Sequence, residues 1–396
     1  MTGWRSKVPR KICILTGSRA DYSHLSPVID AINLHPELLM QLIVTGQHVD
    51  KKYGSTWKNI KNDGYKITKK IDIRLDSDSP LATTQSMGRA VSLIAKNLCE
   101  LDPDFLVLLG DRFETFSAGI AALVLNIPIA HIHGGEETEA AFDDAIRHAL
   151  TKISHLHFCA ARLYANRVRQ MGENPKRIHL VGAPGLDQLS TINYLNAEQL
   201  SSKLKIELTN TIFVIGYHPV TLKPNDTKKS INALISALEE FNNTILVFTG
   251  VNSDPGNSSI SKIIHEFVKL SPKNRIYINT MDKEKYLSLM KISKVVIGNS
   301  SAGLIEAPAL GVPTVNIGDR QKGRITSSSV INCLEEKEEI FKAIKTAVSH
   351  EFQQKTIKSK NFEVGNASKK IAEILANEKI EGITIKSFHD LNWDKK

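Results

Sequence analysis

The chain has 396 residues, a formal net charge of +9 at pH 7 and 41% hydrophobic residues. A single hydrophobic core stops growing at roughly 250–300 residues, so the length predicts two domains. The composition is that of a globular protein, and no stretch has the length of a membrane span, so we expect no membrane partner. The lysines and arginines are spread along the chain without interleaved aromatic residues. We interpret them as a solvated basic surface and expect no nucleic-acid partner.

The cysteines and the N-terminus indicate the compartment. Cys13, Cys99, Cys159 and Cys333 lie far apart without a CxxC pair, and the first three lie in apolar runs. Buried free thiols are typical of a reducing cytosol. The apolar run near the N-terminus is too short for the core of a secretory signal peptide. The sequence therefore predicts a cytoplasmic protein.

In the first half of the chain, short apolar runs alternate with longer amphipathic segments. Apolar strands that alternate with helices predict a parallel sheet covered on both faces. The expected strands are residues 11–15, 41–45, 104–109, 128–132, 157–160 and 177–181, and the expected helices are residues 23–34, 89–101, 113–125, 143–152 and 161–171.

The same alternation starts again in the second half, after a linker at 182–200 that is rich in glycine, proline and turn residues. We predict an α/β fold with two doubly wound, Rossmann-like domains facing a cleft, with ligands beyond the carboxyl ends of the strands. The expected strands are residues 212–217, 244–250, 275–279, 294–298 and 313–317, and the expected helices are residues 228–241, 258–269, 282–291, 301–310, 336–349 and 367–378. The predicted units are residues 1–190, residues 191–365, and a final helix and tail at 366–396.

Two stretches of the first half follow strands and can carry chemistry. LTGSRADYSHL (15–25) predicts a helix N-terminus, whose free N–H groups bind anions, and Arg19 adds a guanidinium for phosphate. It matches neither GxGxxG nor a P-loop. In LLGDRFET (108–115), Asp111 follows a strand, where it either caps the next helix or takes part in catalysis.

A third stretch, HIHGGEETEAAFDDAIRH (131–148), holds three histidines and five carboxylates. On a strand, His131 and His133 point the same way, and the glycines after them allow a backbone to approach a ligand. Asp143 begins a helix, where the helix dipole favours a carboxylate, so capping is its alternative role. An HxH pair with a carboxylate can bind zinc, but the rest of the chain offers no further ligand cluster.

The second half offers candidate groups for a nucleotide. In IGYHPVT (215–221), His218 follows a strand and points into the cleft. In the segment 297–324, the opening of a helix offers N–H and hydroxyl donors for a diphosphate, a glutamate follows for ribose hydroxyls, and two arginines add charge. These residues are Asn299, Ser300, Ser301, Gly303, Glu306, Arg320 and Arg324.

Together, these motifs resemble the hydrolysing branch of the UDP-N-acetylglucosamine 2-epimerase family, whose members start the synthesis of sialic- and legionaminic-type sugars. The resemblance covers about residues 10–375. The motifs occur in the family's order and are GSRADYSHL, GDRFE, GGE…DDAIRHALTK, GAPGLD, YHPVT, GNSSAG and GDRQKGR. The resemblance implies a glycosyltransferase-B fold whose last helix packs on the first domain. It also implies a homo-oligomer (dimer or tetramer) that needs neither a metal nor a cofactor.

The resemblance also implies a reaction on a UDP-sugar. Elimination of UDP across C1–C2 gives a 2-acetamidoglucal, and water then adds to release a free manno-configured sugar. The family's catalytic carboxylates fall on Asp111 and Asp143, while Arg19 and His218 match its phosphate-binding positions. The nucleotide would lie on the second domain, on His218, the 298–306 segment, Asn252 and Asp254.

One departure from the family's pattern bears on the substrate. The sialic-acid enzymes carry EGGE where this chain has HGGE, and the residue that differs is His133. A histidine can serve as the acid or base there with a pKa nearer neutrality, and Glu136 can take part of the role. HGGE resembles the legionaminic-acid branch. We therefore favour UDP-N,N'-diacetylbacillosamine over UDP-N-acetylglucosamine.

Alternatives remain open at this point. A UDP-sugar glycosyltransferase of the same fold explains the 298–306 segment but not the acidic cluster at 136–144. A non-hydrolysing epimerase would carry PEExNR where this chain has DDAIRH. A zinc hydrolase, a nucleotide-sugar-binding module without catalysis and a GDP-linked substrate are further alternatives. The sequence does not assign the acid and the base.

Overall fold

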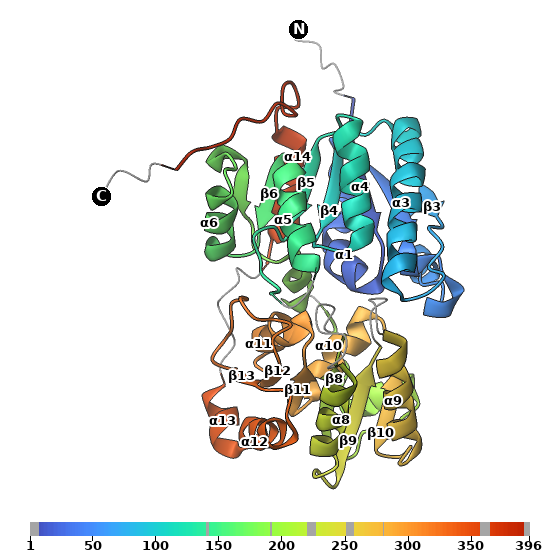
Figure 1. Ribbon diagram of the computed structural model, residues 1–396, viewed down its shortest axis with the longest axis vertical. Coiled ribbons are helices and arrows are strands. Elements are labelled where there is room, and N and C mark those ends of the chain that lie inside the picture. Colours follow the sequence, from blue (N-terminus) through green and yellow to red (C-terminus); the bar gives the residue numbers. More distant parts are fainter. Residues whose placement is uncertain are drawn as a thin grey trace.

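The computed structural model describes residues 8–139, 142–190, 192–219, 227–250, 257–279, 281–356 and 365–391. They form two α/β domains, one above the other in Figure 1, each built on a parallel sheet. This confirms the predicted fold class. Within these described ranges, no helix has the length and hydrophobicity needed to cross a membrane.

The first sheet has seven parallel strands in the order β3-β2-β1-β4-β5-β6-β7. The order reverses once, between β1 and β4, which is where open α/β sheets place their ligands. The strands are β1 (Arg10–Thr16), β2 (Leu38–Thr45), β3 (Lys69–Ile71), β4 (Phe105–Leu109), β5 (Ile129–Ile132), β6 (Leu156–Cys159) and β7 (Ile178–Leu180). The helices are α1 (Arg19–Leu34), α2 (Trp57–Asn62), α3 (Pro80–Leu101), α4 (Phe113–Val124), α5 (Asp143–Ile153) and α6 (Arg162–Gln170).

The second sheet has six parallel strands in the order β10-β9-β8-β11-β12-β13, with its reversal between β8 and β11. The strands are β8 (Thr211–Gly216), β9 (Thr244–Thr249), β10 (Arg275–Ile278), β11 (Val295–Gly298), β12 (Thr314–Ile317) and β13 (Val330–Cys333). The helices are α7 (Ala197–Leu204), α8 (Thr227–Leu238), α9 (Asn257–Lys269), α10 (Lys283–Ile292), α11 (Glu306–Leu310), α12 (Lys337–Val348) and α13 (His350–Lys355).

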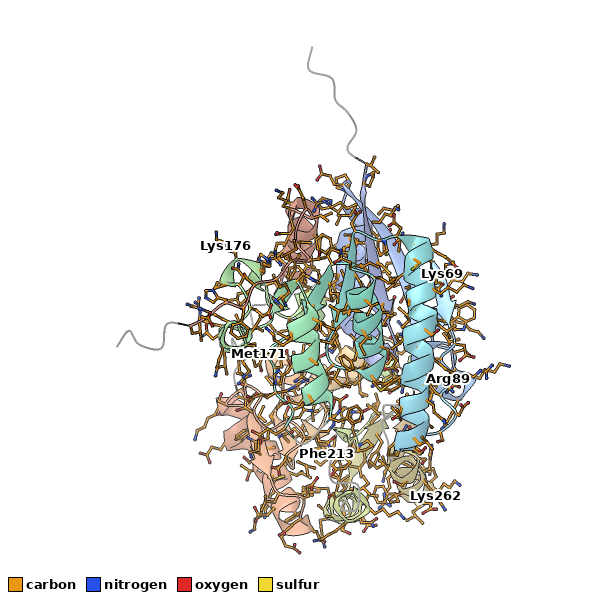
Figure 2. All side chains as sticks on the ribbon, turned by 45° about the horizontal axis from the view of Figure 1, so that its top comes forward. Lys69, Arg89, Met171, Lys176, Phe213 and Lys262 are labelled. Carbon is orange, nitrogen blue, oxygen red and sulfur yellow. The ribbon has the colours of Figure 1, made fainter. Side chains whose placement is uncertain are left out.

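The apolar strands are buried on both faces, as their sequences predict. In β1, Ile12 and Ile14 join the core on one face, while Cys13 and Leu15 join the core on the other. Each fully buried aliphatic side chain stabilises the fold by about 1.5–3 kcal/mol. Charged side chains gather at the periphery, as Figure 2 shows for Lys176 and Lys262, and both are exposed.

The last helix, α14 (Ala367–Asn377), returns to the first domain after the whole second domain has been built. Its Ile371 and Leu375 are fully buried in the same core as Ile29 of α1. Arg10 donates a hydrogen bond of 2.7 Å from Nη1 to the carbonyl of Leu375. Figure 1 shows α14 (red) with the upper domain. The helix therefore stabilises the first sheet rather than the second.

Several element predictions from the sequence are wrong. Helix α3 begins at Pro80 rather than 89, because Ser79 caps it and a proline fits the first turn. The expected helix 301–310 is a 3-10 turn at Ser301–Gly303 followed by α11. Pro308 lacks an N–H and falls in the first turn of α11, where a helix needs no N–H donor. The sequence also missed α2, β3, β13 and α13, and α7 lies partly in the expected linker. Cys99 is exposed, not buried.

The tail after α14 is attached to the first domain by a buried ion cluster around Glu173. Its carboxylate contacts Lys386 of the tail (2.7 Å), Lys152 of α5 (2.7 Å) and His157 of β6 (3.0 Å). Burial raises the pKa of Glu173, but His157 and the two lysines outweigh it and lower the pKa to about 2. Glu173 is therefore ionised throughout the neutral range and holds the tail in place.

We expect Glu173→Gln to lower the free energy of unfolding at pH 7 by about 2–3 kcal/mol, because a buried charged acceptor loses its partners. The folded pKa is depressed, so this contribution is present above the ordinary pKa of Glu and is lost as the pH falls toward 2. Urea unfolding at pH 7 and below pH 4.5 measures both effects. The control is Glu381→Gln in the same tail, which breaks only an exposed pair with Lys379. A wild-type advantage that does not shrink in acid would contradict the assignment.

Candidate functional site

The two points of strand reversal meet between the domains, where the structure forms two adjoining cavities. The larger measures about 550 Å³ and the smaller about 160 Å³. Both are bounded by His24, His218, Ser300 and Ser301. The larger cavity extends over α1, α10 and the end of β9. The smaller one reaches the loops after β4 and β5.

Arg19 is the first residue of α1 and lines the larger cavity. The N-terminus of this helix is closed by a capping box: Ser18 accepts from the Asp21 N–H, and Asp21 accepts from the N–H groups of Gly17 and Ser18. Some of the N–H groups that we expected to be free for an anion are thus hydrogen-bonded within the chain. Arg19 reaches across the cleft and donates from Nη1 to the carbonyl of Asn279 at 2.7 Å.

Asp111 follows β4 and lines the smaller cavity together with Asp143, the first residue of α5. The Asp111 carboxylate forms an ion pair with Arg147, whose side chain is only 1% exposed. Arg147 also donates to Thr138 Oγ1 at 3.1 Å and lies 3.5 Å from Asp144. Sequence analysis missed Arg147. The sequence feature that could have identified Arg147 is its position four residues after Asp143, because residues four apart lie on one face of a helix, here α5.

His133 and Glu136 lie at the other side of this cavity. His133 is just past the end of β5 and has a left-handed backbone (φ +67°), which turns it away from the strand's own alternation. Its Nδ1 lies 2.5 Å from Glu136 Oε1. Arg324 Nη2 lies 3.3 Å from the other carboxylate oxygen. Burial raises the pKa of Glu136, but His133 and Arg324 outweigh it and lower the pKa to about 2.

His131 does not belong to this arrangement. It is fully buried, its Nε2 lies 2.7 Å from the carbonyl of Gly110, and it lines neither cavity. Burial lowers its pKa to about 4. The prediction that His131 and His133 point the same way applies to a strand, but β5 ends at Ile132 and His133 has a left-handed backbone. Nowhere in the described ranges do three or more His, Cys, Asp or Glu side chains gather in a metal-binding arrangement.

On the second domain, Asn299 holds His218 in place. Its side-chain amide accepts from the His218 N–H at 2.7 Å and donates to the His218 carbonyl at 2.9 Å. Asn299 is fully buried and lines neither cavity, while His218 lines both. The expected contact between Asn299 and a diphosphate is therefore replaced by support of His218 and, through the Asn299 carbonyl, of Arg320 (3.1 Å).

The other predicted residues of the second domain divide into lining and packing residues. Ser300 caps the 3-10 turn and, with Ser301, lines both cavities, while Glu306 lines the larger and Arg320 the smaller. Gly303 lines neither; a Cβ there would press on Thr314 of β12, so this glycine serves close packing. Asn252 and Asp254 lie outside the described residues.

Two further groups of the cleft were missed: His24 lies within α1, and Lys283 is the first residue of α10. His24 of α1 stands where the cavities join, 3.6 Å from Glu306 and edge-on to His133. Burial lowers its pKa to about 4, so the ring is neutral at pH 7. Lys283 of α10 donates from Nζ to the carbonyl of Ser23 at 2.6 Å, and burial lowers its pKa to about 8.

We expect Asn299→Ala to lower the free energy of unfolding by about 2–4 kcal/mol, because the buried N–H and carbonyl of His218 both lose their partner. Chemical denaturation followed by far-UV circular dichroism measures this loss. The control is Asn316→Ala on β12, whose side chain bonds only Asn332 (2.8 Å) and should cost about 1 kcal/mol. Equal costs for the two variants would contradict the support of His218.

Comparison with known proteins agrees with this geometry. A family model described as UDP-N-acetylglucosamine 2-epimerase matches residues 30–376. The chain is 37% identical over 345 residues to the GDP/UDP-N,N'-diacetylbacillosamine 2-epimerase (hydrolyzing) of Campylobacter jejuni, covering 87% of this chain and 89% of the relative. It is 38% identical over 344 residues to polysialic acid biosynthesis protein P7 of Escherichia coli, covering 87% of each.

The solved structures show the same fold. The UDP-N-acetylglucosamine 2-epimerase from Neisseria meningitidis, bound to UDP-GlcNAc, matches with a TM-score of 0.77 and 18% identity. The match covers 92% of this chain and 99% of that one. The expected glycosyltransferase-B type of architecture is thereby confirmed.

Proposed function

The chain belongs to the UDP-N-acetylglucosamine 2-epimerase family, and we propose that it is a hydrolysing 2-epimerase that converts a UDP-linked 2-acetamido sugar to the free manno-configured sugar and UDP. The observation that carries the proposal is the pair of joined cavities. One is bounded by cationic and hydroxyl groups that suit a nucleotide, and the other holds the proton-transfer groups. A binding module has no need of the second cavity.

The larger cavity would take the UDP moiety. Ser300 and Ser301 offer hydroxyl and N–H donors beside His218, at the junction where the diphosphate must pass from one cavity to the other. Arg19 supplies positive charge from the opposite domain. Glu306 is 5% exposed, and its Oε2 has no hydrogen-bond partner among the described residues, which suits an acceptor for a ribose hydroxyl.

The smaller cavity would hold the sugar, and its groups match a reaction with two proton transfers. In the first step a base removes the proton at C2, the C–H electrons form the C1=C2 bond, and the C1–O bond breaks as UDP leaves. In the second step the oxygen of water bonds to C1, and C2 receives a proton on the other face. Asp111, ion-paired with Arg147, and Asp143 can accept protons, and His133 beside ionised Glu136 can donate one.

We propose UDP-N,N'-diacetylbacillosamine as the favoured sugar, with UDP-N-acetylglucosamine next. The support is the HGGE sequence at His133 and the name of the Campylobacter relative, which is a hydrolysing enzyme for the diacetylbacillosamine nucleotide. Since that name includes a GDP-linked sugar, the test includes GDP-N,N'-diacetylbacillosamine. Product identification by NMR in D₂O tests all three substrates.

The expected result is free manno-configured sugar plus nucleoside diphosphate, with deuterium at C2 of the product. Deuterium at C2 reports the broken C–H bond, and the release of the diphosphate separates a hydrolysing from a non-hydrolysing epimerase. Turnover that requires an added acceptor sugar would instead identify a glycosyltransferase. No product from any of the three nucleotides would overturn the proposed reaction.

We further propose that the protein works in the cytoplasm as a dimer or tetramer, with domains divided near residues 190 and 365. The free cysteines support the cytoplasmic compartment. The return of α14 to the core of the first domain supports a domain division near residue 365. Leu123 and Val124 at the end of α4 are 47% and 81% exposed, which supports burial in an interface. Light scattering with size exclusion measures the assembly.

Asp111→Asn and Asp143→Asn should each lower kcat by roughly 10²–10⁴-fold, because each removes a proton-transfer group while keeping its shape. UDP affinity, measured by calorimetry, should stay within about twofold. The control is Glu139→Gln, which removes an exposed carboxylate of the same loop that pairs with Lys322 at 2.8 Å. Loss of UDP binding with kcat retained would move the two aspartates to a binding role.

His133→Glu should raise the preference for UDP-N-acetylglucosamine over UDP-N,N'-diacetylbacillosamine by about tenfold in kcat/KM, if His133 helps to select the sugar. His133→Gln removes the proton carrier without adding a carboxylate, so it should slow both sugars alike. Competition between the two nucleotides in one tube measures the ratio directly. An unchanged ratio in His133→Glu excludes a part in sugar selection.

A further inference from the structure

The second domain contacts the loop that carries His133 and Glu136. Arg324, in the loop after β12, lies 3.3 Å from the Glu136 carboxylate and donates from Nε to the carbonyl of Glu137 at 3.1 Å. Its neighbour Gly323 packs so closely on Glu137 that a Cβ there would collide with that side chain. Lys322 forms a more exposed pair with Glu139. The loop at 322–324 of the second domain thus packs along the acidic loop at 136–139 of the first domain.

Both oxygens of the Glu136 carboxylate are occupied, one by His133 and the other by Arg324. Glu136 is 3% exposed, so it has little water to solvate its charge. A buried carboxylate with two cationic partners stays ionised. A buried carboxylate with a single cationic partner is ionised less readily, because burial raises its pKa. The state of the His133–Glu136 pair therefore depends on a side chain that belongs to the other domain.

We propose that Arg324 is a positioning residue that makes the His133–Glu136 pair competent for proton transfer only when the second domain is closed on the first. The proposal rests on the proposed function, because it concerns the same reaction. Arg324 acts through Glu136: it keeps the carboxylate ionised, and the ionised carboxylate orients the imidazole and supports its proton. Opening of the cleft to release product would separate Arg324 from Glu136, and the His133–Glu136 pair would then no longer be competent for proton transfer.

The surroundings of Glu136 identify what else affects its charge. His24 of α1 and His131 of β5 face it as rings whose pKa values burial lowers to about 4. Tyr164 of α6 and Cys159 of β6 face it as neutral groups whose pKa values burial raises to about 12. None of the four supplies a positive charge at pH 7. Arg167 of α6 also lies at this loop, where it donates to the carbonyl of Gly135 at 2.5 Å and pairs with Glu137 at 2.9 Å, so Arg324 is the arginine that contacts the Glu136 carboxylate itself.

The test compares Arg324→Gln, Arg324→Lys and wild type, with Lys322→Gln as the matched control in the same loop. Without the guanidinium the pKa of Glu136 rises, so the acid limb of the pH profile of kcat should move up by about one pH unit or more. At a pH on the acid limb of the wild-type profile, a shift of one unit lowers kcat about tenfold in Arg324→Gln, with recovery in Arg324→Lys and little change in Lys322→Gln. UDP affinity should stay within about twofold of wild type in all three variants.

A weaker affinity for UDP with an unchanged pH profile would make Arg324 a nucleotide-binding residue and overturn the proposal. An unchanged kcat and pH profile would also overturn it. Histidine NMR gives a readout that needs no turnover: the ring resonances of His133, which report the contact between its Nδ1 and Glu136, should shift in Arg324→Gln and stay in place in Lys322→Gln. If wild type fails to turn over any sugar nucleotide, the proposed function fails, while these resonances still decide the role of Arg324.

Discussion

The reversal of strand order in each sheet is the constraint on which the rest of the site depends. Strands β1 and β4 in one domain, and β8 and β11 in the other, run parallel but lead to connections that leave in opposite directions. Each reversal opens a crevice at the carboxyl ends of the strands. Because the two crevices face each other, side chains from sequence-distant loops share one pair of cavities.

The two domains contribute different chemistry to this shared space. The first domain supplies the carboxylates and His133, while the second supplies serine donors, His218 and the cation Arg324. Hydrogen bonds cross the cleft from both sides, from Arg19 to Asn279 and from Lys283 to Ser23. These contacts hold the domains together over the cleft, and Arg324 joins the second domain to Glu136.

The sequence predicts the parts of this arrangement that depend on local pattern. Apolar runs located the central strands, and polar residues directly after them located Asp111, His218 and Ser300. It could not predict Arg147 as the partner of Asp111, because that pair joins residues 36 positions apart. It predicted that His131 and His133 point the same way, as on a strand, and only the left-handed turn after β5 shows that they have separate surroundings. Asn299 looked like a ligand-binding residue because an amide that supports a neighbour has the same sequence pattern.

The histidines show how burial separates residues of one type into different roles. His131 is enclosed and His24 lines both cavities, and loss of water around each ring lowers its pKa to about 4, so neither ring is cationic at neutral pH. His133 differs because it has an ionised carboxylate at 2.5 Å and an opening to the smaller cavity. A proton carrier needs both a partner that stabilises its charged form and access to the substrate. His133 has both. The second domain, through Arg324, therefore controls the histidine that the first domain presents.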